Sequence, residues 1–411
     1  MSFCRVQSVF SRKAIAALIF TASALPGCQT AADRRPEPES HPPVYNSLPF
    51  QSVPFSLLTD DFDGNGQIDI AVVSHSASYA QIFFQKNRRH FSPGQKVDAV
   101  GFHPGDLIKL PGKPPSYLMA AEGENALFLM KPTVDGDLKK AGALNETAAR
   151  HAAVFQWPGW GVSLAVSPFQ DDYLVLLKDF DSGQGAASER IKVPLSDKHP
   201  SIRRVDYVTV ADVDGDRVDE ILFASRTTNQ LWMLKYPRKG GEIRPSLVHE
   251  FKQGAPMQVL ALDVNGNGSL DLIVPDQSTP YQIHVLLNDG SGHFQESTPL
   301  PFPTEVGIRR VAARTDRDGS KYLLAAGYGA IVLYRFPEKW DGRAKVTAVT
   351  LPMVHKEGVQ DIVLRDVDGD GWLDGIVGRG LGGKDMDGVW IIYGPLWEHF
   401  AELADEKFEL K

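Results

Sequence analysis

Four short segments of the chain share one pattern of oxygen-bearing side chains. Each has Asp or Asn at positions one, three and five, glycine at position four and an acid at position nine. Calcium takes six to eight oxygen ligands, and carboxylates supply both the bonds and the neutralising charge. The pattern therefore predicts a structural calcium ion in each segment. The predicted ligands are Asp61, Asp63, Asn65, Asp69, Asp212, Asp214, Asp216, Glu220, Asp263, Asn265, Asn267, Asp271, Asp366, Asp368, Asp370 and Asp374.

An EF-hand loop starts in the same way but ends differently. It carries Glu at position twelve and lies between two helices. In these segments position twelve is always apolar, as Val72, Phe223, Val274 or Val377. Strand-like stretches such as "IDIAVVS" and "LDLIVP" surround that position. The loops are therefore predicted to connect β-strands.

The segments recur with a period of about 50 residues. Asp212 and Asp263 are 51 residues apart, Asp366 follows 103 residues later, and Asp61 precedes Asp212 by 151 residues. The longer gaps hold two apolar runs and a decayed copy, "TDRDGSKYLLAAG". Asp, Asn and Gly are also ordinary turn formers, but unrelated turns do not share a period.

Units of 40 to 50 residues with several short strands are typical of a β-propeller. The sequence therefore predicts an all-β fold: a seven-bladed β-propeller of four-stranded blades over residues 47–400, with the calcium loops between strands one and two. In the last blade, strands are predicted at 360–365, 373–378 and 389–393. Its fourth strand is expected from residues 44–50, because a propeller that does not join its first and last blades leaves an open edge.

The repeated motif, as in "DVDGDGWLD", resembles that of the FG-GAP/VCBS repeat proteins, whose seven-bladed members include the integrin α-subunit head. The resemblance covers about residues 50–400 and implies that calcium binds between the first and second strands of a blade. Arg217 departs from the pattern by replacing the second glycine, and Asn265 with Asn267 leave the Asp263 loop with two carboxylates. That loop is expected to bind calcium most weakly. The decayed copy has Leu324 at position nine and is expected to bind none.

Residues 1–27 have the features of an export signal. Three basic residues precede an apolar stretch, 14–25, that is too short to span a bilayer. The stretch leads into "LPGC", which resembles the bacterial lipoprotein cleavage box and predicts lipidation of Cys28. An ordinary signal peptide cleaved nearby is the alternative. Lipidation is favoured because Cys28 would otherwise be a lone exported thiol, Cys4 being lost with the signal.

The regions that flank the predicted propeller suggest a membrane-anchored, exported protein. Residues 28–46 are rich in proline and polar side chains and are expected to form an extended tether. Gln29 is not the aspartate that favours inner-membrane retention, so we expect an outer-membrane lipoprotein of the cell envelope, facing the periplasm or the surface. Residues 401–411 are assigned to a C-terminal tail, although the stretch from Leu396 has helical spacing and suggests a packing helix or a last strand.

Composition and motifs narrow the function without naming it. The formal net charge of −8 is accounted for mainly by the metal loops and does not suggest a nucleic-acid partner. The His-Glu-x-x-His, Gly-x-Ser-x-Gly and Cys-x-x-Cys motifs are absent, as are the tryptophan-docking repeats of quinone-cofactor propellers. We therefore expect a propeller that binds a glycan or protein ligand without catalysis. The alternative is a polysaccharide lyase or hydrolase acting on an anionic polysaccharide, which a His, Tyr or carboxylate pair outside the metal loops would favour.

The starts of the first strands are expected to converge around the axis, on the side opposite the calcium loops. Guanidinium groups pair with carboxylates and tryptophans stack on sugar rings, so basic and aromatic residues there predict an anionic envelope polymer, such as a uronic-acid glycan, as ligand. Alternatively, they are loop charges paired with Asp106, Asp206 or Glu357. The predicted ligand-binding residues are His103, Trp157, Trp160, Arg203, Arg204, Arg309, Arg310, His355 and Lys356.

Overall fold

The computed structural model describes residues 43–98, 100–145, 149–168, 171–181, 185–195, 205–252, 254–303, 307–353, 358–380 and 388–405. The chain divides into the units Met1–Pro43 and Val44–Lys411, and the description that follows concerns the second unit. The predicted export signal, the lipidation site Cys28 and most of the predicted tether lie outside the described residues.

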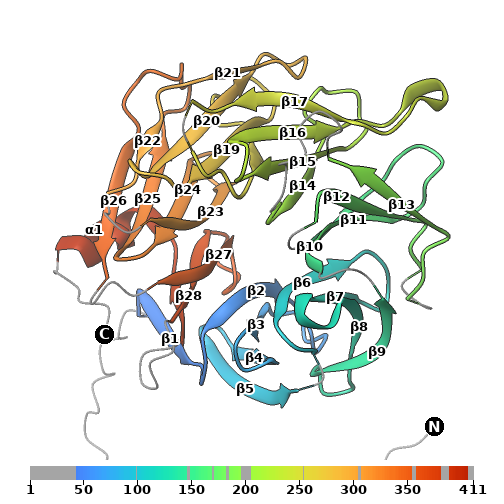
Figure 1. Ribbon diagram of the computed structural model, residues 1–411. Coiled ribbons are helices and arrows are strands. Elements are labelled where there is room, and N and C mark those ends of the chain that lie inside the picture. Colours follow the sequence, from blue (N-terminus) through green and yellow to red (C-terminus); the bar gives the residue numbers. More distant parts are fainter. Residues whose placement is uncertain are drawn as a thin grey trace, which may run out of the picture. The chain divides into compact units, whose positions relative to one another are not determined.

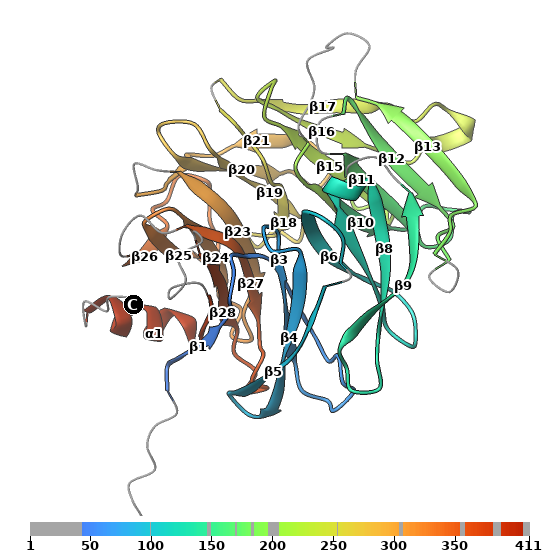
Figure 2. The same ribbon diagram turned by 60° about the horizontal axis from the view of Figure 1, so that its bottom comes forward.

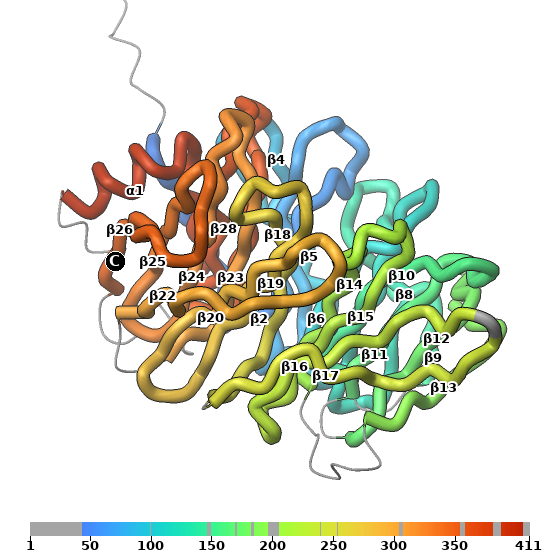
Figure 3. Tube along the Cα trace, turned by 90° about the horizontal axis from the view of Figure 1, so that it is seen from above, coloured from blue at the N-terminus to red at the C-terminus, as the bar shows by residue number. Residues whose placement is uncertain are grey.

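Seven antiparallel sheets follow one another along the chain as the blades of a β-propeller, which confirms the predicted fold (Figure 1). Figure 3 shows the same ring at right angles to this view. Blades one to three consist of β2 (Pro54–Asp60), β3 (Asp69–Ser74), β4 (Tyr79–Asn87), β5 (His90–Val97); β6 (Pro104–Leu110), β7 (Ser116–Ala121), β8 (Ala126–Pro132), β9 (Leu138–Asn145); and β10 (Ala149–Phe155), β11 (Ser163–Pro168), β12 (Tyr173–Lys178), β13 (Glu189–Pro194).

Blades four to seven repeat this arrangement, with two variations at the outer edge. In blade five the short strands β21 and β22 both pair with β20, and in blade seven the outer strand comes from the other end of the chain. The strands are β14 (Val208–Ala211), β15 (Glu220–Ser225), β16 (Gln230–Leu234), β17 (Pro245–Glu250); β18 (Leu260–Leu262), β19 (Asp271–Asp276), β20 (Gln282–Asn288), β21 (Phe294–Glu296), β22 (Leu300–Pro301); β23 (Ile308–Thr315), β24 (Lys321–Gly327), β25 (Ala330–Phe336), β26 (Thr347–Pro352); and β27 (Val359–Arg365), β28 (Asp374–Arg379), β29 (Gly388–Ile392).

The core of the propeller lies between its blades. The second strands are covered on both faces by neighbouring blades, so they are continuous apolar runs with little alternation; β3 is buried at every residue. One cluster, for example, joins blades three and four through Phe155, Trp157, Phe223 and Trp232. The outermost strands, such as β13, have mostly exposed side chains.

The ring is closed by β1 (Tyr45–Pro49), which pairs antiparallel with β29 of blade seven. Leu48 lies opposite Val389, and both Leu48 and Phe50 are buried in the cluster that blades one and seven share. This confirms the prediction that the fourth strand of the last blade comes from residues 44–50. The predicted boundary of the tether at residue 46 is wrong by two residues, because pairing already begins at Tyr45.

A single α-helix occurs among the described residues, α1 (Leu396–Asp405), and it packs beside β26 (Figure 2). Leu396, Phe400 and Leu403 are buried against blades six and seven, as their helical spacing predicts. The predicted boundary between propeller and tail at residue 400 is therefore wrong, because it divides this helix. In the described part of the chain, no helix is both long and apolar enough to span a membrane.

The first strands of the blades lie next to one another around the central axis. Because neighbouring strands are antiparallel, all turns from first to second strands lie on one side of the ring. We name this side, which carries the loops beginning at Asp61, Asp212, Asp263 and Asp366, the acidic face. The turns from second to third strands and the connections between blades lie on the other side, which we name the opposite face.

Candidate functional site

The four repeated loops occupy equivalent positions in blades one, four, five and seven. They join β2 to β3, β14 to β15, β18 to β19, and β27 to β28, as predicted. In each loop a carboxylate oxygen of the ninth residue accepts the backbone amide of the second residue, at 2.8–2.9 Å. Glycines at positive φ allow the chain to turn; Gly66 has φ 85° and Gly371 has φ 89°. Arg217, which replaces the second glycine, adopts the same left-handed conformation with φ 66°.

In three of these loops the carboxylates of positions one, three and nine converge. One ligand atom from each residue lies within 4.8 Å of the other two. In the fourth loop, Asp263 and Asp271 are accompanied by Asn265 and Asn267, whose oxygens accept backbone amides two residues ahead. The converging residues are Asp61, Asp63 and Asp69; Asp212, Asp214 and Glu220; and Asp366, Asp368 and Asp374.

The ninth residue of each loop is a buried acid. Burial raises the pKa of Asp374 to about 8 and that of Glu220 to about 7. Burial likewise raises the pKa of Asp69 and of Asp271 to about 6. A carboxylate removed from water gains most from a nearby cation, since the cation offsets the lost hydration of the charged form.

The acids at position five, Asp216 and Asp370, do not belong to these three-carboxylate clusters. The side-chain oxygens of Asn65, Asp216 and Asp370 accept the backbone amide two residues ahead, as that of Asn267 does. Basic side chains lie beside several of these loops: Arg88 Nη2 is 3.1 Å from Asp370 Oδ2, and Arg238 pairs with Asp216. The loops are therefore partly neutralised by the protein itself.

The predicted ligand-binding residues fall into three groups. His103 precedes β6, and Arg309 and Arg310 open β23, so these three lie at the start of a first strand as predicted. The predicted position of Trp157 and Trp160 is wrong, because both follow the first strand β10 and lie in its turn to β11. Arg203, Arg204, His355 and Lys356 lie outside the described residues.

The tryptophan turn has a structural role on the acidic side of blade three. Trp157 is 2% exposed, and its Nε1 donates to the backbone oxygen of Asp219 at 2.8 Å. Its ring packs edge-on against Trp160 and Phe155. The sequence "FQWPGWG" thus forms an aromatic plug between blades three and four where other blades have an acidic loop.

The sequence pointed to Arg310 and Asp106 but did not reveal that both belong to a ring of seven polar residues around the axis. In five blades a bulge interrupts the start of the first strand, and the residue after the bulge belongs to this ring. Beside the four intact loops, the ring residue stands five positions before the first Asp, which is a sequence signal that could have found it. We name this set the axial ring: Ser56, Asp106, His151, Tyr207, Gln258, Arg310 and Asp361.

One side of the axial ring joins blades one, two and three. Ser56 Oγ donates to Asp106 Oδ1 at 2.7 Å, and His151 Nε2 lies 3.1 Å from Asp106 Oδ2. The backbone amide of Val208 donates to His151 Nδ1 at 3.4 Å. Because Nδ1 accepts, the proton of a neutral His151 is on Nε2, where it is donated to Asp106.

The other side of the axial ring spans the axis. Arg310 of blade six donates to the hydroxyl of Tyr207 in blade four, so this contact passes over blade five. The guanidinium also lies 4.3 Å from the centre of the Tyr207 ring and has Nε 3.4 Å from Asp361 Oδ1. Asp361 Oδ2 in turn accepts the amide of Leu57 in blade one, at 2.8 Å. Arg310 is therefore paired within the protein, as the alternative expects, but with Asp361 rather than with Asp106, Asp206 or Glu357.

Burial and charge set the protonation of the axial ring. Burial raises the pKa of Asp106 and of Asp361 to about 6, with Arg310 opposing the rise. Burial lowers the pKa of His151 to about 3, and the positive charges of Arg310 and Arg150 add to that effect. At neutral pH the ring thus combines a neutral imidazole, two carboxylates and a guanidinium.

Comparison with known proteins supports the fold and leaves the function open. No family model and no curated protein sequence matches the chain. Virginiamycin B lyase from Staphylococcus aureus is similar in structure, with a TM-score of 0.53 and 13% identity over 84% of this chain and 97% of its own. A putative 6-phosphogluconolactonase from Bacteroides uniformis gives a TM-score of 0.53 and 14% identity over 77% and 88%. A chain in the structure of BBS1N in complex with ARL6DN gives a TM-score of 0.57 and 12% identity over 86% and 98%.

At these identities the likeness establishes the fold alone. The chain is a seven-bladed β-propeller built from repeats, and structures of this shape carry varied functions.

Proposed function

We propose that this chain is a calcium-stabilised propeller of the FG-GAP/VCBS type, anchored to the cell envelope, whose opposite face binds an anionic polysaccharide. The observation that carries the calcium part is the convergence of three carboxylates at the same place in blades one, four and seven. In the first of these loops Asp61 Oδ1 is buried without a hydrogen-bond partner among the described residues, which leaves it available to a cation. The anchoring rests on the sequence of residues 1–28.

Calcium titration of the chelator-treated protein tests the metal sites directly. We expect up to four ions per chain, with the Asp263 loop filling last because it holds two carboxylates. A protein that binds no calcium at millimolar concentration would contradict the proposal.

The choice of an anionic ligand rests on the cations of the opposite face that are not fully paired. Arg309 donates from Nη2 to Gln360 Oε1 at 2.7 Å, but its Nε has no hydrogen-bond partner among the described residues. Arg310, in contrast, already donates to Tyr207 and pairs with Asp361. Arg309 is therefore the described arginine on which we base the ligand test.

Retention on immobilised envelope polysaccharides measures this binding. We expect Arg309→Gln to weaken retention on a uronic-acid polymer without lowering the melting temperature. Arg343→Gln is the matched control, because Arg343 is exposed in the turn from β25 to β26 on the acidic face. Equal retention by both variants would place the ligand elsewhere.

A second function, a lyase or hydrolase acting on the same class of polymer, is favoured by the axial ring. His151 and Tyr207 form edge-to-face contact at 5.1 Å, beside carboxylates that no acidic loop uses. Such groups can exchange protons with a bound substrate. New reducing ends or an unsaturated product, lost in Tyr207→Phe, would establish the enzyme; intact polymer after long incubation would favour binding alone.

A further inference from the structure

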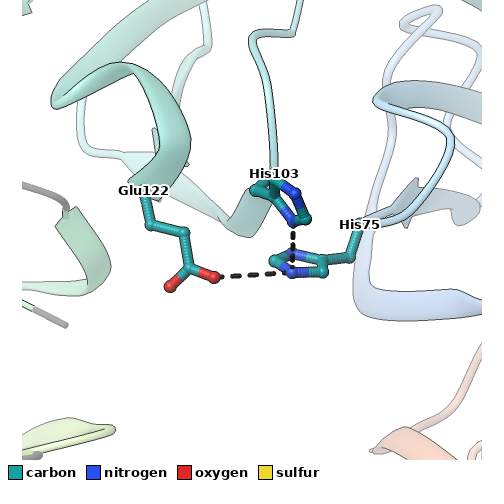
Figure 4. Close-up of side chains that lie close together, drawn as sticks. All are labelled: His75, His103 and Glu122. Atoms are coloured by element: carbon teal, nitrogen blue, oxygen red, sulfur yellow. Dashed lines mark hydrogen bonds and ion pairs between the residues drawn. The ribbon is translucent and has the colours of Figure 1, made fainter.

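Two histidines and a glutamate meet on the opposite face at the junction of blades one and two. His75 follows β3, His103 precedes β6, and Glu122 begins the short 3-10 helix η1 (Glu122–Glu124) after β7. Figure 4 shows the two imidazoles and the carboxylate turned toward one another. None of these residues belongs to a repeated loop, and their separation in sequence hides the cluster.

The distances within the cluster suit a shared metal ion. His103 Nδ1 is 2.9 Å from His75 Nε2, which is 3.4 Å from Glu122 Oε1. One ligand atom from each residue lies within 4.8 Å of the other two. Ligands bound at about 2.0–2.2 Å in tetrahedral or octahedral geometry are about 3 to 3.6 Å apart, so small side-chain adjustments close the site.

The hydrogen bond from His75 Nδ1 fixes which nitrogen of this ring is free to bind a metal ion. His75 Nδ1 lies 3.0 Å from the carbonyl oxygen of Pro104, and because a carbonyl only accepts, Nδ1 carries the proton. In the neutral ring Nε2 then carries a lone pair, which accepts from His103 Nδ1 at 2.9 Å and lies 3.4 Å from the carboxylate of Glu122. A cation between the three side chains would replace the hydrogen bond between the imidazoles with bonds to both rings and to the carboxylate.

The surroundings hold the three side chains in place. The bond from a histidine to a backbone carbonyl is a common support of metal-binding imidazoles. Phe55 stacks on the His75 ring at 4.5 Å, and Arg150 Nη1 donates to Glu122 Oε2 at 3.3 Å, away from the cluster. The backbone amide of Glu122 donates to the carbonyl of His103 at 3.2 Å, which ties the two loops together.

We propose that His75, His103 and Glu122 bind a divalent transition-metal ion, with zinc the best match to two imidazoles and one carboxylate. Calcium prefers an all-oxygen set, so this site differs in kind from the loops of the acidic face. Three protein ligands leave coordination positions for water or for a polar group of a ligand on the opposite face. The inference does not depend on the proposed function.

Titration with Zn²⁺ and with Co²⁺, in millimolar calcium that fills the acidic loops, tests the site. We expect one ion per chain by calorimetry and visible absorption bands from bound Co²⁺. His75→Ala and Glu122→Gln should each weaken binding at least about tenfold. His293→Ala is the control, since that side chain is 85% exposed and lies in blade five.

Glu122→Gln decides the matter if His75→Ala lowers the melting temperature, because it keeps the size of the side chain. The proposal would be overturned if no zinc bound in the presence of millimolar calcium. It would also be overturned if Glu122→Gln and His293→Ala bound zinc with equal affinity. The cluster would then be a hydrogen-bonded contact between blades one and two.

Discussion

The two faces of the propeller are built on opposite principles. On the acidic face, four blades place the same residue types at the same positions, and each loop closes on itself through its ninth residue. On the opposite face, the equivalent positions of the seven blades hold six kinds of side chain, with only Asp used twice, and these bond from blade to blade. A repeated acidic loop therefore stabilises its own blade. A set whose residue types vary from blade to blade forms one asymmetric site around the axis.

The largest expected effect comes from removing calcium, which should act through the acidic face alone. A site filled at 100 times its Kd stabilises the fold by about 2.7 kcal/mol, so three or four sites together exceed the effect of any single substitution. Chelation should lower the melting temperature by many degrees. Asp366→Ala should remove more of the calcium-dependent increment than Asp263→Ala.

Asp318→Ala serves as the control for this comparison. Asp318 is an exposed acid in the decayed loop, whose ninth position is the buried Leu324. Its calcium-dependent increment in melting temperature should equal that of the unmodified protein. An identical melting curve with and without chelator would remove the calcium interpretation.

A smaller loss of unfolding free energy, independent of calcium, is expected from breaking the axial ring. Arg310 is 5% exposed, and Arg310→Ala leaves the partly buried Asp361 without its cation and Tyr207 without its donor. Breaking such a pair typically costs about 3–5 kcal/mol. Chemical unfolding should show the same loss with and without calcium. Arg309→Ala, which removes one bond to Gln360, should cost less; equal losses would mean that the ring is not a connected network.

The sequence predicted what repeats and missed what does not. The period located the blades, the strands of blade seven within a residue, and the strand that closes the ring, because a missing edge strand must come from the other terminus. It also located every acidic loop between first and second strands. These features depend on local patterns that each blade carries by itself.

The axial ring and the His75 cluster depend on contacts that no local pattern encodes. Arg310 and Tyr207 are 103 residues apart and meet only because the first strands of blades four and six both line the axis. The tryptophans were misplaced for a related reason: an apolar "WPGWG" reads as the start of a strand, whereas Gly159, with φ 75°, makes it a turn. Arg309 and Arg310 do lie at a strand start as predicted, but the bonds of Arg310 to Tyr207 and Asp361 required the fold.

An ion cluster in blade five is expected to contribute about 1.5–3 kcal/mol to the free energy of unfolding. This contribution should depend on pH but not on calcium. His284 lies between Asp276 and Glu296, with Nδ1 2.6 Å from Glu296 Oε1. Burial alone would lower the pKa of His284, but its bonds to Asp276 and Glu296 raise it above its ordinary value. The stability this gives is fully present below the unfolded pKa, near 6.5, and is lost as the pH rises through the folded pKa.

Unfolding free energies of the unmodified protein and of His284→Gln, measured from pH 6 to pH 9, check this sign. The difference between them should be largest at pH 6 and shrink toward pH 9. His90→Gln, an exposed histidine in blade one, should show no such trend. A difference that grows with pH would mean that His284 is neutral in the folded protein.

The smallest effect on stability is expected from substituting Arg88. Its sign should differ with and without calcium. Arg88 is 58% exposed and contacts both Asp368 and Asp370 from the neighbouring blade, so it partly neutralises the last acidic loop. Without calcium, Arg88→Ala should cost about 0–1 kcal/mol, as exposed ion pairs do. With calcium the sign should reverse, because the guanidinium would repel a bound cation, and two unit charges 4 Å apart already interact by about 1 kcal/mol in water. We therefore expect calcium to bind up to about tenfold more tightly to the Asp366 loop of Arg88→Ala, measured by titration, whereas Arg343→Ala leaves that affinity unchanged. Weaker calcium binding in Arg88→Ala would show that this arginine shapes the loop rather than competing with the ion.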